Sequence, residues 1–147
     1  MTLIRDPQNI RLAMLGMVDG NGHPYSWSAI INGRYDARTM ADCGFPVIPQ
    51  YLAKQDPATM RLEGVLVTHI WTQDRKISEH VAAASLINNI VEDPRQMIGK
   101  VDAVILARDD GENHLHMAKP FMEAGVPMLI DKPLYCVGEV KRASFLP

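Results

Sequence analysis

The sequence has few of the features that mark disulfide-linked, metal-binding or membrane-spanning proteins. It contains only two cysteines, Cys43 and Cys136, which stand in no metal-ligand spacing. No apolar run approaches the roughly 20 residues that span a bilayer, and the N-terminus lacks the apolar core of a signal peptide. We therefore expect a cytoplasmic protein with reduced thiols, no bound metal and no membrane partner.

A strong excess of one charge is also absent. The formal net charge is -2, with 15 basic and 17 acidic residues, which argues against nucleic acid as a partner. The chain has 147 residues, of which 47% are hydrophobic and 22% charged. That length and composition are typical of one globular domain with its own core.

Segments with strand and helix patterns alternate along the chain. The clearest strand is Val-Asp-Ala-Val-Ile-Leu-Ala at 101–107, and Gly125 is expected to end the helix that follows it. Alternation of this kind predicts an α/β fold, a doubly wound parallel sheet of about five strands in the order 3-2-1-4-5, with helices on both faces. The expected strands are 10–15, 64–71, 88–91, 101–107 and 126–130, and the expected helices are 25–32, 77–87, 93–98 and 114–124.

Residues 33–63 interrupt this alternation. They separate a helix from the next strand by far more than the usual two to six residues, so we interpret them as an insertion with at most one short helix near 49–54. The insertion is either a surface excursion or an interface or lid. The expected organisation is one domain at 1–134, which contains this insertion, and a short C-terminal tail at 135–147.

The turn after the first strand is rich in glycine. A doubly wound sheet binds its ligand at the carboxyl ends of the strands, where glycines let the backbone approach a pyrophosphate. Gly16, Gly20, Gly22 and His23 stand between the first strand and the first helix, although their spacing is not G-x-G-x-x-G. We predict that they contact a dinucleotide, with a plain flexible turn as the alternative.

The end of the second strand is the expected position of the ribose contact. An acidic residue there would bind a free 2′-hydroxyl, but this chain has Thr72, followed by Asp74 and Arg75. A neutral residue and a nearby cation slightly favour NADP over NAD. The alternative is that these side chains are solvent-exposed groups of a loop with no role in binding. Further contacts with the cofactor are expected at the ends of the fourth and fifth strands, from Ala107, Arg108, Asn113, His114, Asp131 and Pro133.

Three motifs in order connect the chain to a known family. They are Val-Asp-Ala-Val-Ile-Leu-Ala at 101–107, Met-Glu-Ala-Gly-Val-Pro at 122–127 and Asp-Lys-Pro-Leu at 131–134. With them, residues 9–134 resemble the Rossmann domain of the glucose–fructose oxidoreductase and inositol dehydrogenase family. The resemblance implies NAD(P) binding and gives Lys132 the role of the catalytic lysine near the nicotinamide. The family's helix-start histidine corresponds to either His114 or His116.

The family's second domain, which supplies most of the substrate pocket, has no counterpart in the sequence. The leading hypothesis is therefore a cofactor-binding domain that is not catalytic alone. The alternatives are a non-enzymatic remnant or regulatory module, and a minimal reductase whose pocket is completed by a neighbouring subunit. We also expect a homo-oligomer, because the flank of the fifth strand would otherwise be left bare.

Overall fold

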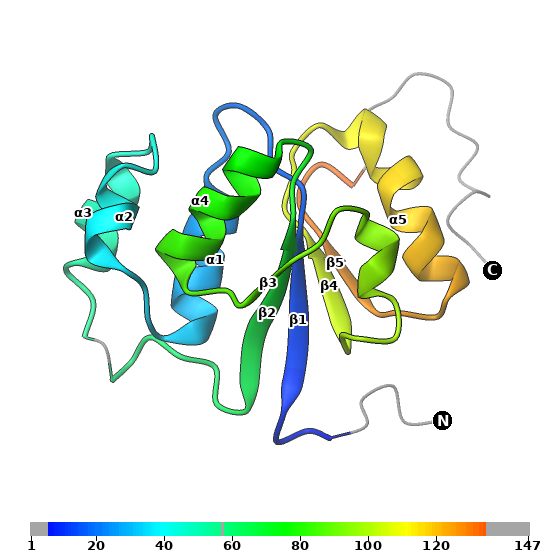
Figure 1. Ribbon diagram of the computed structural model, residues 1–147, viewed down its shortest axis with the longest axis horizontal. Coiled ribbons are helices and arrows are strands. Elements are labelled where there is room, and N and C mark those ends of the chain that lie inside the picture. Colours follow the sequence, from blue (N-terminus) through cyan, green and yellow to red (C-terminus); the bar gives the residue numbers. More distant parts are fainter. Residues whose placement is uncertain (1–5, 57, 135–147) are drawn as a thin grey trace.

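A computed structural model describes residues 6–56 and 58–134, and in it five parallel strands form one sheet (Figure 1). Their order is β3-β2-β1-β4-β5, which confirms the predicted topology. The predicted C-terminal tail, 135–147, lies outside the described residues. The strands are β1 (Ile10–Leu15), β2 (Val65–Trp71), β3 (Asn89–Ile90), β4 (Ala103–Leu106) and β5 (Met128–Ile130).

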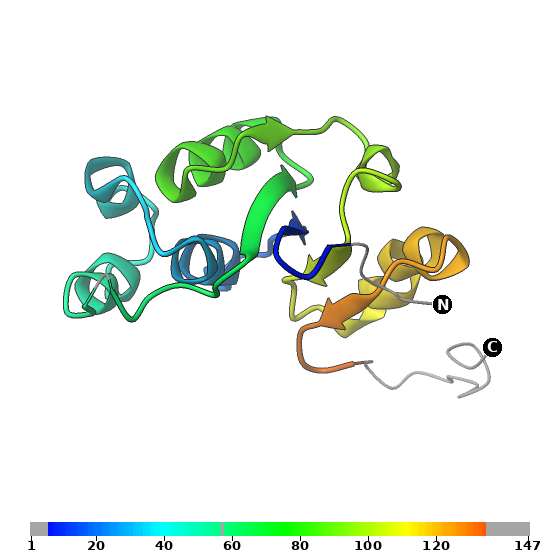
Figure 2. The same ribbon diagram turned by 90° about the horizontal axis from the view of Figure 1, so that it is seen from below.

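Helices cover both faces of the sheet, as Figure 2 shows with the sheet seen end-on. Helices α1 (His23–Asn32) and α4 (Arg75–Ser85) cover one face, and α5 (His114–Glu123) with the 3₁₀ turn η1 (Pro94–Met97) covers the other. Each face has its own apolar cluster, because neighbouring residues of β1 point to opposite sides. Met14 belongs to the cluster under α1 and α4, and Leu15 to the cluster under α5.

The insertion forms two helices, so the prediction of at most one is wrong. Helix α2 (Ala37–Ala41) begins at Asp36, whose side chain accepts a hydrogen bond of 2.7 Å from the backbone N–H of Thr39. Helix α3 (Val47–Leu52) follows, and both helices lie outside α1, away from the sheet (Figure 1). The cap at Asp36 is a sequence signal that stabilises even a five-residue helix once it packs on neighbours.

Helix boundaries follow local chemistry that the sequence indicates only in part. Asp93 caps η1 through its side chain, and Gly125, the expected end of the helix, adopts a left-handed conformation (φ 70°) just after α5. Helix α1 begins at His23, two residues before the expected start, with Gly22 as its cap and no side-chain cap bond. Within the described ranges, no helix is long and apolar enough to cross a membrane.

Candidate functional site

The loop after β1 ends in a tight turn at the carboxyl edge of the sheet. The backbone N–H of Asn21 donates to the carbonyl of Val18 at 3.1 Å and closes the turn. At its tip, Asp19 and Gly20 are exposed, and their backbone N–H groups have no acceptor among the described residues. Gly20 has φ +82°, and open space surrounds the position where a Cβ would stand. The tip therefore offers free donors with room for a ligand.

The start of α1, in contrast, has few free backbone N–H groups that could bind an anion. The N–H of His23 donates to the side chain of Asn21 at 2.9 Å, and Pro24 has no N–H. The next two backbone N–H groups, of Tyr25 and Ser26, donate to the carbonyl of Gly22. The expected binding of a pyrophosphate at the helix N-terminus would thus need donors that the protein itself already uses.

The other two glycines of this loop are required by protein packing. A Cβ on Gly16 would stand 2.4 Å from Cδ of Arg108, and one on Gly22 would stand 2.5 Å from Cδ1 of Ile48 in α3. A Cβ at either distance would force the neighbouring side chain to move. Gly22 thus lets the insertion pack against the first turn of α1, while Gly20 is the glycine that faces open space.

The residues predicted to contact the ribose are engaged within the protein. Buried Thr72 donates from Oγ1 to the carbonyl of Asp74 at 2.6 Å, and the Asp74 carboxylate caps α4 by accepting from the N–H of Lys76. Arg75 forms ion pairs with Glu79 and Glu92. All three residues lie at the carboxyl end of β2, as expected, but none has a free group that singles out a 2′-phosphate.

Sequence reasoning missed Gln73 at the same end of β2. Its side-chain amide pairs with the backbone N–H and carbonyl of Met17. This pairing holds the loop after β1 against the loop after β2. The tertiary fold determines which backbone groups an amide side chain binds, so no local sequence pattern identifies Gln73 as part of the site.

A hollow of about 560 Å³ lies at the carboxyl edge, between β2 and α5. Trp71, Arg108, Asn113 and His116 are among the residues that line it. Arg108 is buried and pairs with Asp110. The hollow combines an indole, a guanidinium and an imidazole, which is a suitable lining for a planar base.

The two histidines of α5 have different environments. His114 is completely buried, with Nε2 3.0 Å from the carbonyl of Arg108 and Nδ1 3.3 Å from that of Leu134. It therefore ties the loop after β4 to the loop after β5. His116 is exposed and lines the hollow. Ala107, the predicted contact that precedes Arg108, is completely buried.

Asp131, at the end of β5, is the centre of a buried polar cluster. Its Oδ2 lies 2.6 Å from Nδ1 of His23 and accepts from the side-chain amide of Asn21 at 3.2 Å. Its Oδ1 accepts from the N–H of Lys132 at 2.8 Å. Burial raises the pKa of Asp131, but these hydrogen bonds outweigh it and hold the pKa below its ordinary value.

Lys132 and Pro133 continue the chain from Asp131 and are exposed. The ammonium of Lys132 lies 3.6 Å from a carboxylate oxygen of Asp109, and the peptide bond between Lys132 and Pro133 is cis. The structure thus brings His23, Asp131 and Lys132 together, although they come from opposite ends of the sequence.

The lowered pKa of Asp131 predicts a loss of stability in acid. A group with a depressed folded-state pKa stabilises the protein above its unfolded-state value, about 3.9, and this contribution disappears as the pH falls through the folded-state pKa. We expect wild type to exceed Asp131→Asn in free energy of unfolding at pH 7, and the difference to shrink as the pH falls below about 4. Urea unfolding at several pH values measures it. A difference that stays constant down to pH 2 would contradict the assignment.

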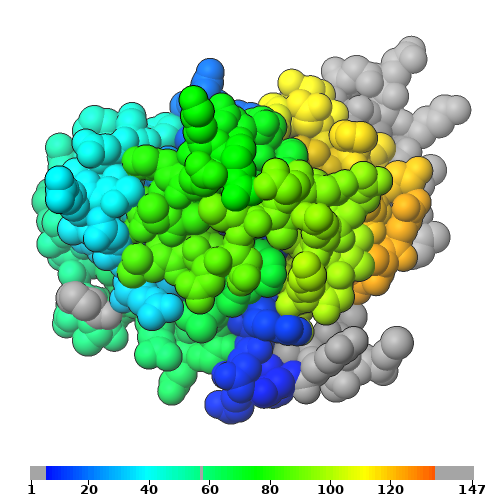
Figure 3. Space-filling model, viewed as in Figure 1, coloured from blue at the N-terminus to red at the C-terminus, as the bar shows by residue number. Residues whose placement is uncertain are grey.

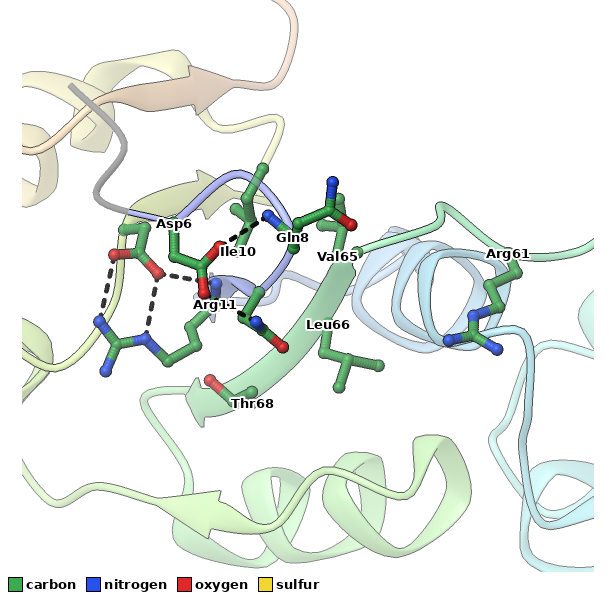
Figure 4. Close-up of a pocket in the computed structure, with 11 residues that line it drawn as sticks. Asp6, Gln8, Ile10, Arg11, Arg61, Val65, Leu66 and Thr68 are labelled. Atoms are coloured by element: carbon green, nitrogen blue, oxygen red, sulfur yellow. Dashed lines mark hydrogen bonds and ion pairs between the residues drawn. The ribbon is translucent and has the colours of Figure 1, made fainter. Parts of the chain in front are cut away.

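A second hollow, of about 480 Å³, lies at the amino ends of β1 and β2 (Figure 4). Gln8, Arg11, Leu66 and Thr68 are among its lining residues, and Arg11 forms a two-point ion pair with Asp102. Ligands of doubly wound sheets bind at the opposite, carboxyl edge. We therefore place the functional site at the carboxyl edge.

Comparison with known proteins agrees with this geometry. Residues 46–144 match the sequence profile of the oxidoreductase family with an NAD-binding Rossmann fold. The chain belongs to this family. Because the match begins at Pro46, it covers α3 to β5 and leaves out the glycine turn. A comparison with curated protein sequences finds no significant match.

Several solved structures similar to this NAD-binding domain are chains about three times as long. Myo-inositol 2-dehydrogenase from Lactobacillus plantarum has a TM-score of 0.55 and 16% identity, and 86% of this chain covers 29% of it. Scyllo-inositol dehydrogenase from Lactobacillus casei, solved with NAD(H) and scyllo-inositol, has a TM-score of 0.55, 12% identity and the same two coverages. An NAD-binding oxidoreductase from Klebsiella pneumoniae has a TM-score of 0.54 and 18% identity, with coverages of 87% and 28%. This chain thus spans less than a third of each relative, and the likeness concerns the fold.

The residues at the carboxyl edge of this NAD-binding domain fit a dinucleotide with one change. The hollow beside Trp71 suits the adenosine half, and the free N–H groups of Asp19 and Gly20 suit the diphosphate. The change is that the free N–H donors lie at the turn tip and not at the start of α1. In the described ranges, no group of three or more His, Cys, Asp or Glu side chains is arranged to hold a metal.

Proposed function

We propose that this chain binds NAD(H) across the carboxyl edge of its sheet and serves as the cofactor domain of an oxidoreductase. The observation that carries the proposal is the free turn tip at Gly20, on the same edge as the hollow beside Trp71. Family membership supports it. When bound, NAD supplies the hydride acceptor, and the chain's residues bind it and orient it. The domain comprises residues 1–134, with the insertion at 33–63.

Lys132 is the proposed catalytic lysine. Its ammonium stands at the carboxyl end of β5, beside Asp109 and two residues from Leu134. The resemblance of Asp131-Lys132-Pro133 to the family motif supports the role. We place Lys132 where a substrate oxygen can meet a positive charge.

The choice of NAD over NADP is part of the proposal. The sequence slightly favours NADP because Arg75 follows the second strand and could supply a cation to a 2′-phosphate. Arg75 is instead paired with Glu79 and Glu92, and Glu92 lines the hollow beside Trp71. Two carboxylates next to Arg75 oppose the binding of a phosphate at that position.

Self-association also stays a prediction. The edge strand β5 leaves Leu129 58% exposed, and Leu134 beyond it is exposed to the same extent. These apolar groups support a neighbouring subunit against the edge where Asp131 and Lys132 lie. Such a subunit would complete the substrate pocket, as in the hypothesis of a minimal reductase.

Titration of the purified chain with NADH and with NADPH tests the proposal. Trp71 lines the hollow and Trp27 stacks on His23, so both report on the carboxyl edge. We expect NADH to quench their fluorescence with a Kd on the order of micromolar, and NADPH to bind no more tightly. Arg75→Ala serves as the control and should leave the NADH affinity unchanged. Absence of binding to either dinucleotide, confirmed by calorimetry, would favour a non-enzymatic module.

A further inference from the structure

We propose that His23, held in place by Asp131, exchanges a proton with the reacting oxygen of an alcohol or carbonyl substrate. The inference rests on the proposed function and adds a residue of this chain to its chemistry. The sequence alone indicates only a cofactor contact for His23.

The location of the pair supports this role. His23 begins α1, which follows β1, whereas Asp131 follows β5, and β4 lies between these strands. The pair therefore crosses over the carboxyl end of β4. The hollow beside Trp71 and Glu92 lies on the β2 side of the same edge. A dinucleotide with its adenosine in that hollow has its reacting half over β4 and β5.

Two contacts fix the imidazole of His23. Nδ1 lies 2.6 Å from Oδ2 of Asp131, and the ring stacks on Trp27 with centroids 4.2 Å apart and planes 10° from parallel. Nε2 has no partner among the described residues, and the side chain is 31% exposed. The imidazole is therefore held on one nitrogen and open on the other.

The carboxylate of Asp131 is also fixed by contacts within the protein. It is buried, and Asn21 and the backbone N–H of Lys132 occupy further positions on its carboxylate. The hydrogen bonds that lower its pKa keep it ionised at neutral pH. An ionised carboxylate at Nδ1 favours a proton on Nδ1 and leaves the lone pair of Nε2 free. It also stabilises the imidazolium that forms when Nε2 takes a proton.

NAD⁺, when bound, would be the oxidant. It would accept a hydride from the carbinol carbon of the substrate and be reduced to NADH, and the C–O single bond would become a carbonyl. The hydroxyl proton passes to Nε2 of His23, and it returns to the oxygen in the reverse direction. Lys132 is suited to a different task, because its side chain is 71% exposed and, within the described residues, its ammonium pairs with Asp109 alone.

Modification of the wild-type chain with diethyl pyrocarbonate, mapped by mass spectrometry, tests whether His23 lies beside the reacting half of the bound dinucleotide. The reagent attacks an imidazole nitrogen with a free lone pair. The free protein should react at His23 and at the exposed His116. ADP should slow the reaction of His116, which lines the hollow, by about fivefold or more and leave His23 within about twofold. NADH should slow both.

The outcomes separate the inference from the proposed function. If NADH protects neither histidine, both the proposed function and the inference about His23 fail. If NADH protects His116 alone, the cofactor site stands and the role of His23 falls. If ADP protects His23 as well as NADH does, His23 is a phosphate contact and the inference is overturned.

The tautomer of His23 is an independent measurement on the same protein. Long-range ¹H–¹⁵N spectra of the neutral imidazole should show the proton of His23 on Nδ1, with His116 as the exposed reference. A proton on Nε2 of His23 would leave no free lone pair there and would overturn the proposal.

Discussion

Replacing Gly20 by valine is expected to weaken NADH binding by about tenfold or more, equivalent to about 1.4 kcal/mol. Gly20 has φ +82° at the exposed tip of the turn, where the backbone N–H groups are free. Valine would fill the space that a diphosphate needs and would resist the left-handed backbone. Calorimetric titration with NADH measures the change in affinity.

Gly99→Val is the matched control for the turn. Gly99 has φ +81° and the same open surroundings, but it lies before β4, at the amino edge of the sheet. Both variants should lose about 1–2 kcal/mol of stability through backbone strain. Only Gly20→Val should lose affinity for NADH. An equal loss of affinity in the two variants would show that strain, and not the turn tip, controls binding.

Phe121→Ala is expected to lower the free energy of unfolding by about 3–5 kcal/mol. Phe121 is a completely buried aromatic side chain in the described part of the chain, and it packs α5 against the sheet in the cluster with Leu106. Removing its ring leaves a cavity that the surrounding strands cannot close. Urea-induced unfolding measures the loss.

Met122→Ala, at the next position of α5, controls for helix propensity. Met122 is 41% exposed, so its truncation should cost less than about 1 kcal/mol. If the two variants were equally destabilised, α5 would not pack on the sheet through Phe121. Because Phe121 also lines the hollow beside Trp71, its loss is expected to weaken NADH binding as well.

The strand order was predictable because its signals are local. Apolar runs such as 101–107 identify buried strands, and the alternation with helices leaves few allowed topologies. The insertion was harder to predict. Its helices α2 and α3 are too short to show a full amphipathic period, so the Asp36 cap was the only local signal of α2.

The sequence places Gly20, Asp131 and Lys132 at the carboxyl ends of strands and so predicts them as neighbours of a ligand. The contacts among the residues at this edge were not predictable. Their partners depend on residues far apart in the sequence. His23 and Asp131 are separated by 108 positions, and no pattern in either segment indicates the other.

Some residues that the sequence predicts as ligand contacts instead form hydrogen bonds within the protein. Thr72 and Asp74 stabilise the start of α4, and His114 joins two loops from a fully buried position. Polar residues at strand ends have two competing uses, as helix caps and as ligand contacts. The sequence alone does not separate these uses, because the same residue types serve both.

Mapping NADH binding by ¹⁵N chemical-shift changes on the uniformly labelled chain tests the central claim most directly. We predict the largest changes at the carboxyl edge, at Gly20 and Asn113 and at the indole N–H of Trp71. Residues of the amino-edge hollow, such as Arg11 and Thr68, should change little. Changes concentrated at Arg11 and Thr68, or none anywhere at millimolar NADH, would contradict the account.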